Sequence, residues 1–254
     1  MGEAISVRQD CKFKRDCKRF KSGKCDQYCY PYTLMHGLNG KGGFWGLSNV
    51  PVAYRDCLVD NLPIKDSNPQ IYKAVVLYIG NVLQKVQESG RGIFFVGDTG
   101  TGKTTTAITI LNEYLVARVK QHLTSDYKVT TNPVFFARMA EFQNLYNSQF
   151  RGSQDQQITN SDRYYAYKDV LTKTELLVID DVAMRGLTEG FQNELYEIID
   201  HRVINRLTTI FTANVMYNEM VEFLGERIVS RIKGLAGKPI VFKGNDYRES
   251  GLFS

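Results

Sequence analysis

The chain lacks a long apolar segment, an apolar export signal and a large net charge. No run of eighteen apolar residues occurs among its 254 residues, so we expect no membrane-spanning helix. The first residues contain no apolar core of the kind that a signal peptide needs, which predicts a cytoplasmic protein. A formal net charge of +5 is too small to identify an acidic partner. A hydrophobic content of 43% is typical of a globular protein with a sizeable core.

The clearest motif is a phosphate-binding loop. Residues 97–104 read Gly-Asp-Thr-Gly-Thr-Gly-Lys-Thr and fit the pattern G-x-x-x-x-G-K-[ST] at each required position. Apolar residues 93–96 predict a buried strand before the loop, and apolar residues at helical spacing predict a helix after it. Strand, loop and helix in this order predict a site for ATP or GTP. The nucleotide is expected to contact Gly97, Asp98, Thr99, Gly100, Thr101, Gly102, Lys103, Thr104 and Thr105.

Each part of this loop has a chemical role. The glycines let the backbone turn its N–H groups toward phosphate oxygens, and the following helix adds the positive end of its dipole. Lys103 is expected to reach the β- and γ-phosphates, and the Thr104 hydroxyl to ligate Mg²⁺.

Apolar strand-like runs alternate with helical patterns along the rest of the chain. Strands are predicted at 134–136, 176–179, 208–213 and 239–242, and a helix from Pro69 to Gly90 after Asn68 as its N-cap. Polar residues 151–164 show no periodicity and predict a surface loop. The alternation predicts an α/β fold with a parallel sheet and helices on both faces.

Polar residues follow two of these strands at the edge where ligands bind in open α/β sheets. Asp180 is expected to hold Mg²⁺ together with Thr104, and Asp181 to polarise the attacking water. Asn214 is placed to sense the γ-phosphate. Hydrolysis also needs positive charge beyond Lys103, and Arg227 and Arg231, four residues apart on one helical face, are the candidates for an arginine finger.

Four of the five cysteines lie within the first thirty residues. Cys11, Cys17, Cys25 and Cys29 predict a tetrahedral Zn²⁺ site, with His36 as a possible substitute ligand and free thiols as the alternative.

Basic and aromatic residues are interleaved with the cysteines. This pattern suits a nucleic-acid backbone, an acidic protein surface or a solvated face equally well. Residues 37–46 contain five glycines and predict a flexible linker in which Phe44 and Trp45 dock on another part of the protein.

Several segments together resemble the AAA+ ATPases of the DnaC/DnaI helicase-loader and IstB group, relatives of the initiator DnaA. The matching segments are NVPVAYR at 49–55, GDTGTGKT, LLVIDDV, FTANV, residues 226–231 and Asp246-Tyr247-Arg248. The resemblance implies an AAA+ fold with strand order 5-1-4-3-2 and ATP at a subunit interface. It also implies Asn214 as sensor 1 and Arg231 as the arginine finger, assisted by Arg227. The chain stops soon after Arg248, so no helical lid is expected.

The resemblance implies a bacterial or phage loader of the hexameric replicative helicase onto single-stranded DNA, active as an assembled homo-oligomer. We expect a zinc-bearing adaptor at residues 1–47, an ATPase domain at 48–254, and slow hydrolysis because Asp181 stands where a glutamate is usual. Arg138, Arg151 and Arg163 are candidate DNA contacts. The alternatives are an IstB-like transposition ATPase and a nucleic-acid-binding module in which ATP is only structural.

Overall fold

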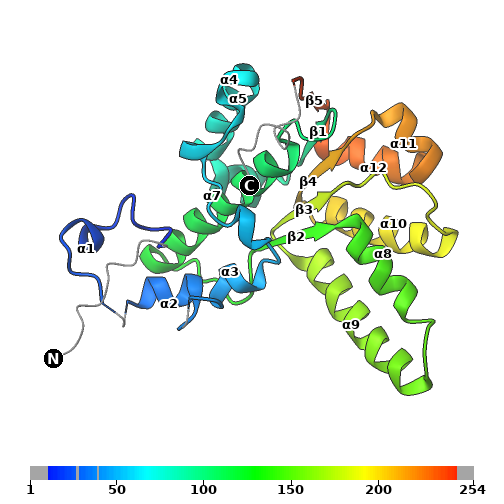
Figure 1. Ribbon diagram of the computed structural model, residues 1–254, viewed down its shortest axis with the longest axis horizontal. Coiled ribbons are helices and arrows are strands. Elements are labelled where there is room, and N and C mark those ends of the chain that lie inside the picture. The colour runs from blue at the N-terminus through cyan, green and yellow to red at the C-terminus, as the bar shows by residue number, and fades with distance from the viewer. Residues whose placement is uncertain (1–10, 27–28, 39, 245–254) are drawn as a thin grey trace.

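Five parallel strands form the centre of the molecule (Figure 1). The computed structural model describes residues 11–26, 29–38 and 40–244. The strands are β1 (Ile93–Val96), β2 (Val134–Arg138), β3 (Leu176–Asp180), β4 (Thr208–Ala213) and β5 (Ile240–Val241). They pair in the order β2-β3-β4-β1-β5, and every neighbouring pair is parallel. The expected order 5-1-4-3-2 is therefore confirmed.

Helices cover both faces of this sheet (Figure 1). The first face is covered by α5 (Pro69–Gly80), α6 (Val82–Gln84) and α7 (Lys103–Thr124). The second face is covered by α8 (Met139–Ser148), α9 (Gln154–Lys173), α10 (Glu189–Ile204), α11 (Tyr217–Leu224) and α12 (Glu226–Ala236). The shorter helical segments are α1 (Lys18–Lys21), α2 (Tyr30–His36), α3 (Gly43–Leu47), η1 (Val52–Tyr54), η2 (Val59–Asn61), α4 (Ile64–Ser67) and η3 (Lys85–Ser89).

Alternation along the strands creates two hydrophobic cores. In β1, Phe95 packs in the core under α7, while Phe94 packs in the core under α10 and α12. Both side chains are fully buried, and the same division holds along β3 and β4. Because helices cover both faces, every position of β1, β3 and β4 is buried, which explains the apolar runs of β1 and β3. In β4, Thr208, Thr209 and Thr212 are buried as well. No helix among the described residues is long and apolar enough to cross a membrane.

The predicted surface loop at 151–164 is wrong, because α9 begins at Gln154. Ser153 caps this helix by accepting a hydrogen bond from the Gln156 backbone N–H, and the Gln156 side chain bonds back to Ser153. Tyr164 and Leu171 are the only residues of α9 that are fully buried. So sparse an apolar stripe shows little periodicity, but the capping box Ser-x-x-Gln was a usable signal.

Two other predicted elements differ in detail. The helix predicted from Pro69 to Gly90 is divided, because α5 ends at Gly80 and a π-helical turn, η3, follows α6. The glycine-rich segment at 37–46 contains the start of α3, and Trp45 within it is buried as expected. A Cβ atom on Gly43 would lie 2.6 Å from the Leu34 carbonyl oxygen, so this glycine permits the close packing of α2 and α3.

The cysteine-rich segment packs on the side of α7. Phe13 and Tyr32 belong to the same hydrophobic core as Leu111 of α7. Arg15 forms a bidentate ion pair with the buried Glu113 of α7, with N–O distances of 3.0 and 2.7 Å. Among the described residues, three further ion pairs join residues 11–26 to the rest of the chain. They are Lys12 with Asp56, Arg15 with Asp60 and Asp16 with Lys120. Part of the basic pattern therefore serves an acidic protein surface, and that surface is the rest of this chain.

We expect Glu113→Ala to lower the free energy of unfolding by about 2 kcal/mol, because Glu113 also accepts a hydrogen bond from the Val59 backbone N–H. Asp16→Ala is the matched control. It breaks an exposed pair with Lys120 and should cost less than about 1 kcal/mol. Urea unfolding followed by circular dichroism measures both values. Equal losses in the two variants would mean that the buried pair does not hold the segment in place.

Candidate functional site

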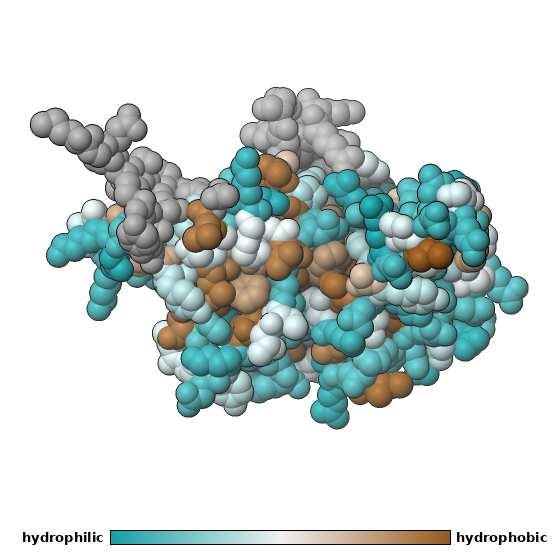
Figure 2. Space-filling view, turned by 90° about the horizontal axis from the view of Figure 1, so that it is seen from below, coloured by the Kyte–Doolittle hydropathy of each residue, from teal (hydrophilic) through white to brown (hydrophobic). Residues whose placement is uncertain are grey.

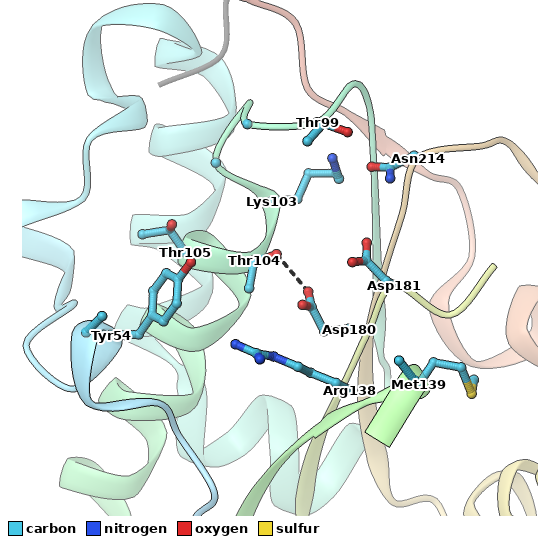
Figure 3. A pocket seen from close by; sticks show the side chains of 14 residues that line it. Tyr54, Thr99, Lys103, Thr104, Thr105, Arg138, Met139, Asp180, Asp181 and Asn214 are labelled. Carbon is cyan, nitrogen blue, oxygen red and sulfur yellow. Dashed lines mark hydrogen bonds between the residues drawn. The ribbon is translucent and has the colours of Figure 1, made fainter. Parts of the chain in front are cut away.

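The phosphate-binding loop lies between β1 and α7 and wraps around the start of that helix (Figure 3). Gly97, Gly100 and Gly102 have φ angles of 148°, 77° and 95°, which other residues rarely adopt. A Cβ atom on Gly97 would lie 2.5 Å from the Phe242 carbonyl oxygen. The loop can therefore pass closely beside the end of β5 only with glycine at this position.

Lys103 lies inside the loop and is almost completely buried. Its Nζ donates to the carbonyl oxygens of Gly97 and Asp98 at 2.8 and 2.6 Å. Thr101 also donates to the Asp98 carbonyl oxygen, at 2.8 Å. These bonds hold the lysine ammonium at the centre of the loop, where an anionic phosphate would meet it.

Thr104 and Asp180 face each other across the floor of the site. The Thr104 hydroxyl donates to Asp180 Oδ1 at 2.7 Å, and the Thr212 hydroxyl donates to the same oxygen at 2.7 Å. Two oxygens at this separation fit adjacent positions around Mg²⁺, whose Mg–O bonds of about 2.1 Å place neighbouring ligands about 3 Å apart. Thr104 and Asp180 would therefore hold the metal, which would neutralise charge on the phosphates.

Burial dominates the electrostatics of Asp180. It raises the pKa of this carboxyl, and the charge of Asp181 acts in the same direction. Hydrogen bonds from Thr212 and Thr104 and the positive charge of Arg138 lower the pKa. A buried carboxylate of this kind favours a cation beside it.

Asp180→Asn is expected to separate stability from function. The asparagine carbonyl can accept the bonds from Thr104 and Thr212 without a buried charge, so we expect thermal unfolding at a temperature higher by a few degrees. Mg²⁺-dependent nucleotide binding should weaken at least about tenfold, since the metal loses its anionic ligand. Thermal melting and nucleotide titration with and without Mg²⁺ measure the two effects. Lower stability combined with unchanged Mg²⁺ dependence would contradict this role of Asp180.

Asp181 and Asn214 lie at the same edge of the sheet and line the cavity. Asp181 has a positive φ of 52°, and its backbone N–H donates to the Thr212 hydroxyl at 2.9 Å. This bond fixes the turn after β3 and leaves the carboxylate exposed at the cavity. Asn214 directly follows β4 and is also exposed. In Figure 3, Asn214 lies next to Lys103, and Asp181 lies below Asn214.

The cavity has a volume of about 560 Å³, within the range of small-molecule sites. Its lining includes residues that were not predicted to contact the nucleotide, namely Ala53, Tyr54, Arg138, Met139 and Ala140. Tyr54 reaches the site because Asn112 of α7 donates to its backbone carbonyl oxygen at 3.0 Å. The only sequence signal for Ala53 and Tyr54 was that they belong to the NVPVAYR segment. No sequence pattern indicated that Arg138 lines the nucleotide cavity.

Arg227 and Arg231 lie outside this cavity, on the exposed face of α12. Arg227 stacks on the Tyr196 ring of α10 with its guanidinium 4.2 Å from the ring centroid. Arg231 pairs with Asp200 at 2.8 Å, and 45% of its side chain is exposed. Hydrogen bonds from Arg231 and Arg227 lower the pKa of Tyr196, and the positive charge of Arg231 acts in the same direction. Neither arginine lines the cavity of its own chain.

The structure does not support the predicted zinc site. Among the described residues, which include all four cysteines of the cluster, no group of three or more Cys, His, Asp or Glu side chains could hold a metal ion. Cys11 is buried in the hydrophobic core, and Cys17 and Cys29 pack against it. Burial raises the pKa of Cys11, and Cys29, Cys17 and Cys25 act in the same direction. The substitute ligand His36 instead stacks on Tyr32 with 4.6 Å between ring centroids.

The three arginines expected to contact DNA do not lie together. Arg138 lines the nucleotide cavity, whereas Arg151 and Arg163 are exposed at the turn after α8 and on α9. The Asp246-Tyr247-Arg248 segment lies outside the described residues.

Comparison with known proteins gives a consistent result, although no family model matches the chain. The replicative helicase loader DnaC of Buchnera aphidicola subsp. Acyrthosiphon pisum is 24% identical over 205 residues, which cover 80% of this chain and 74% of the relative. The DnaC loader of Escherichia coli K12 is 27% identical over 154 residues, or 61% and 55% of the two chains.

Solved structures show the same fold. A crystal structure of the DnaC helicase loader matches with a TM-score of 0.55 and 20% identity, covering 76% of this chain and all of that one. The replication initiator DnaA bound to AMPPCP and single-stranded DNA matches with a TM-score of 0.56 and 17% identity. The match covers 78% of this chain and 52% of the DnaA chain. The chain is therefore related to the replicative helicase loaders of the DnaC/DnaI type and has their AAA+ fold.

Proposed function

We propose that this protein is an ATP-dependent loader that places a replicative helicase on single-stranded DNA during the initiation of replication. One observation carries the proposal: a chain similar to replicative helicase loaders over 205 residues folds so that Lys103, Thr104 and Asp180 converge on one cavity. A nucleotide pocket in such a relative gives the loader a means of coupling its action to ATP.

The residues of the cavity suggest how ATP is bound and hydrolysed. The loop N–H groups and Lys103 hold the phosphates, and Thr104 and Asp180 hold Mg²⁺, which offsets the charge that develops on the γ-phosphate. Asp181 is exposed at the cavity edge, where its carboxylate can orient water for attack, and Asn214 can hydrogen-bond the same water or the γ-phosphate. Aspartate is one methylene shorter than the usual glutamate, which is consistent with slow hydrolysis.

The exposed arginines suggest a shared active site. Arg227 and Arg231 face away from the cavity of their own chain, so they would serve as a finger only toward a neighbouring copy. ATP would then favour assembly of several ATPase domains (residues 48–254) around the DNA, with Arg151 and Arg163 as phosphate contacts. The segment up to residue 47 would serve as the adaptor that contacts the helicase.

Loading onto circular single-stranded DNA tests this function, because a ring-shaped helicase can enter DNA without ends only if it is opened. The purified chain, the hexameric helicase of its host and circular DNA are mixed with ATP, and DNA-bound helicase is measured after gel filtration. We expect retention of the helicase with the wild-type chain and none with Lys103→Ala. Stable co-elution with a transposase but not with the helicase would replace this function with the transposition one.

A further inference from the structure

Two of the residues that line the nucleotide cavity are cations, Lys103 and Arg138. The Lys103 ammonium is held by the loop carbonyl oxygens of Gly97 and Asp98. Arg138 forms none of the ion pairs that join described residues, and its guanidinium lies 6.0 Å from the Phe136 ring centroid. An exposed guanidinium that forms no ion pair with a described residue, beside a phosphate loop, is available to an anionic ligand.

The sheet order fixes where this guanidinium stands relative to the loop. The phosphate loop follows β1, and Arg138 ends β2, so β4 and β3 lie between them. Within the β2–β3 pair, Arg138 is in register with Asp180. Figure 3 shows its side chain extending from the end of β2 beneath Asp180 and Thr104 toward Tyr54, on the opposite side of Thr104 from Lys103.

Asp180 does not hold the arginine in an ion pair, although Arg138 is its register partner. Asp180 Oδ1 already accepts hydrogen bonds from Thr104 and Thr212, both at 2.7 Å. One carboxylate oxygen is therefore satisfied by hydroxyl groups, and no ion pair joins Asp180 to Arg138 among the described residues. The arginine keeps its hydrogen-bond donors for a ligand while its charge stays close to the predicted metal position.

We infer that Arg138 contacts the terminal phosphate of the bound nucleotide from within the same chain and so distinguishes a triphosphate from a diphosphate. The inference rests on the proposed nucleotide site. The loop and Lys103 would hold phosphates beside β1, and a phosphate chain long enough to pass Thr104 and Asp180 would meet Arg138. Arg138 is the cation that stands beyond these two residues, and its planar fork suits bidentate contact with a phosphate.

This assignment gives each subunit a positive charge at the terminal phosphate that does not depend on a neighbouring copy. It accounts for the presence of an arginine at the end of a strand whose preceding residues, Val134 to Ala137, are all buried and apolar. It also removes Arg138 from the candidate DNA contacts and leaves Arg151 and Arg163.

The test compares ATP with ADP in the full chain. Fluorescent analogues of both nucleotides are titrated in the presence of Mg²⁺ against wild type, Arg138→Gln, Arg138→Lys and the control Arg91→Gln, which changes an exposed arginine that does not line the cavity. We expect Arg138→Gln to weaken ATP binding about tenfold, the typical effect of losing one charge-assisted contact, and to change ADP binding less than about twofold. Arg138→Lys should lose less ATP affinity than Arg138→Gln, and Arg91→Gln should match wild type.

Retained ADP binding shows that the variant is folded, so the ratio of the two affinities decides the matter. Equal losses for ATP and ADP would overturn the inference, because Arg138 would then only shape the pocket. Unchanged ATP binding with weaker binding of a thymidine oligonucleotide would overturn it in favour of a DNA contact. A chain that discriminates ATP from ADP through Arg138 but does not load the helicase would refute the proposed function and leave this inference standing.

Discussion

Lys103→Ala should weaken the binding of ATP and ADP by at least about 100-fold, because the phosphates lose the cation at the centre of the loop. The Lys103 ammonium is buried and is held within the loop by two backbone carbonyl oxygens, and its removal leaves residues 97–104 without a cationic side chain. Titration with fluorescent nucleotide analogues measures the affinities, and circular dichroism reports whether the fold is kept.

Lys65→Ala is the control for this prediction. Lys65 is exposed on α4 and does not line the cavity, so its removal changes the net charge equally without touching the site. We expect the affinity of Lys65→Ala to match that of wild type. If a folded Lys103→Ala protein binds ATP as tightly as the control does, the loop is not the nucleotide site.

Arg231→Ala should leave ATP affinity almost unchanged and lower the hydrolysis stimulated by helicase and single-stranded DNA by about 1,000-fold, the lower end of the range for an arginine finger. The expectation follows from position, because Arg231 is exposed on α12 and is absent from the lining of its own cavity. Action on a neighbouring copy would require Arg231 to leave Asp200 and Tyr196. Arg227→Ala should have a smaller effect.

Mixing variants tests whether the active site is shared. Arg231→Ala protein keeps an intact pocket, and Lys103→Ala protein keeps an intact finger, so mixed assemblies should regain part of the turnover. Lys233→Ala is the control, since Lys233 is an exposed cation on the same helix that contacts the Tyr217 ring. A mixture that co-assembles but shows no recovery of ATP turnover would argue against a finger supplied by a neighbour.

Local patterns in the sequence were sufficient for the sheet and for the phosphate loop. Buried parallel strands are rich in apolar and β-branched residues, so β1 and β3 appeared as apolar runs and β4 as a run of β-branched and aromatic residues. The loop was recognisable because its backbone conformation requires glycine at fixed positions, and Lys103 and Thr104 follow directly. These features depend on residues that are close together in the chain, which is why they could be predicted.

Contacts between distant segments had no such pattern. Arg202 is fully buried, and it donates to the carbonyl oxygens of Leu171, Thr174 and Thr208. In the sequence, it cannot be distinguished from an arginine on the exposed face of a helix. Burial lowers the pKa of Arg202 to about 9. Similarly, the pairing of Arg15 with Glu113 depends on how the segment of residues 11–26 packs against α7.

From the sequence, the strand order could be predicted through the resemblance to a known family, and the phosphate loop could be predicted from its own residues. The tertiary structure alone decided where the isolated charges lie. In the folded chain, Arg138 lines the nucleotide cavity, Arg231 lies outside it and Cys11 is buried in the hydrophobic core. The physical reason is that a motif constrains neighbouring residues, whereas the environment of a single charged or thiol side chain is set by packing between elements far apart in sequence.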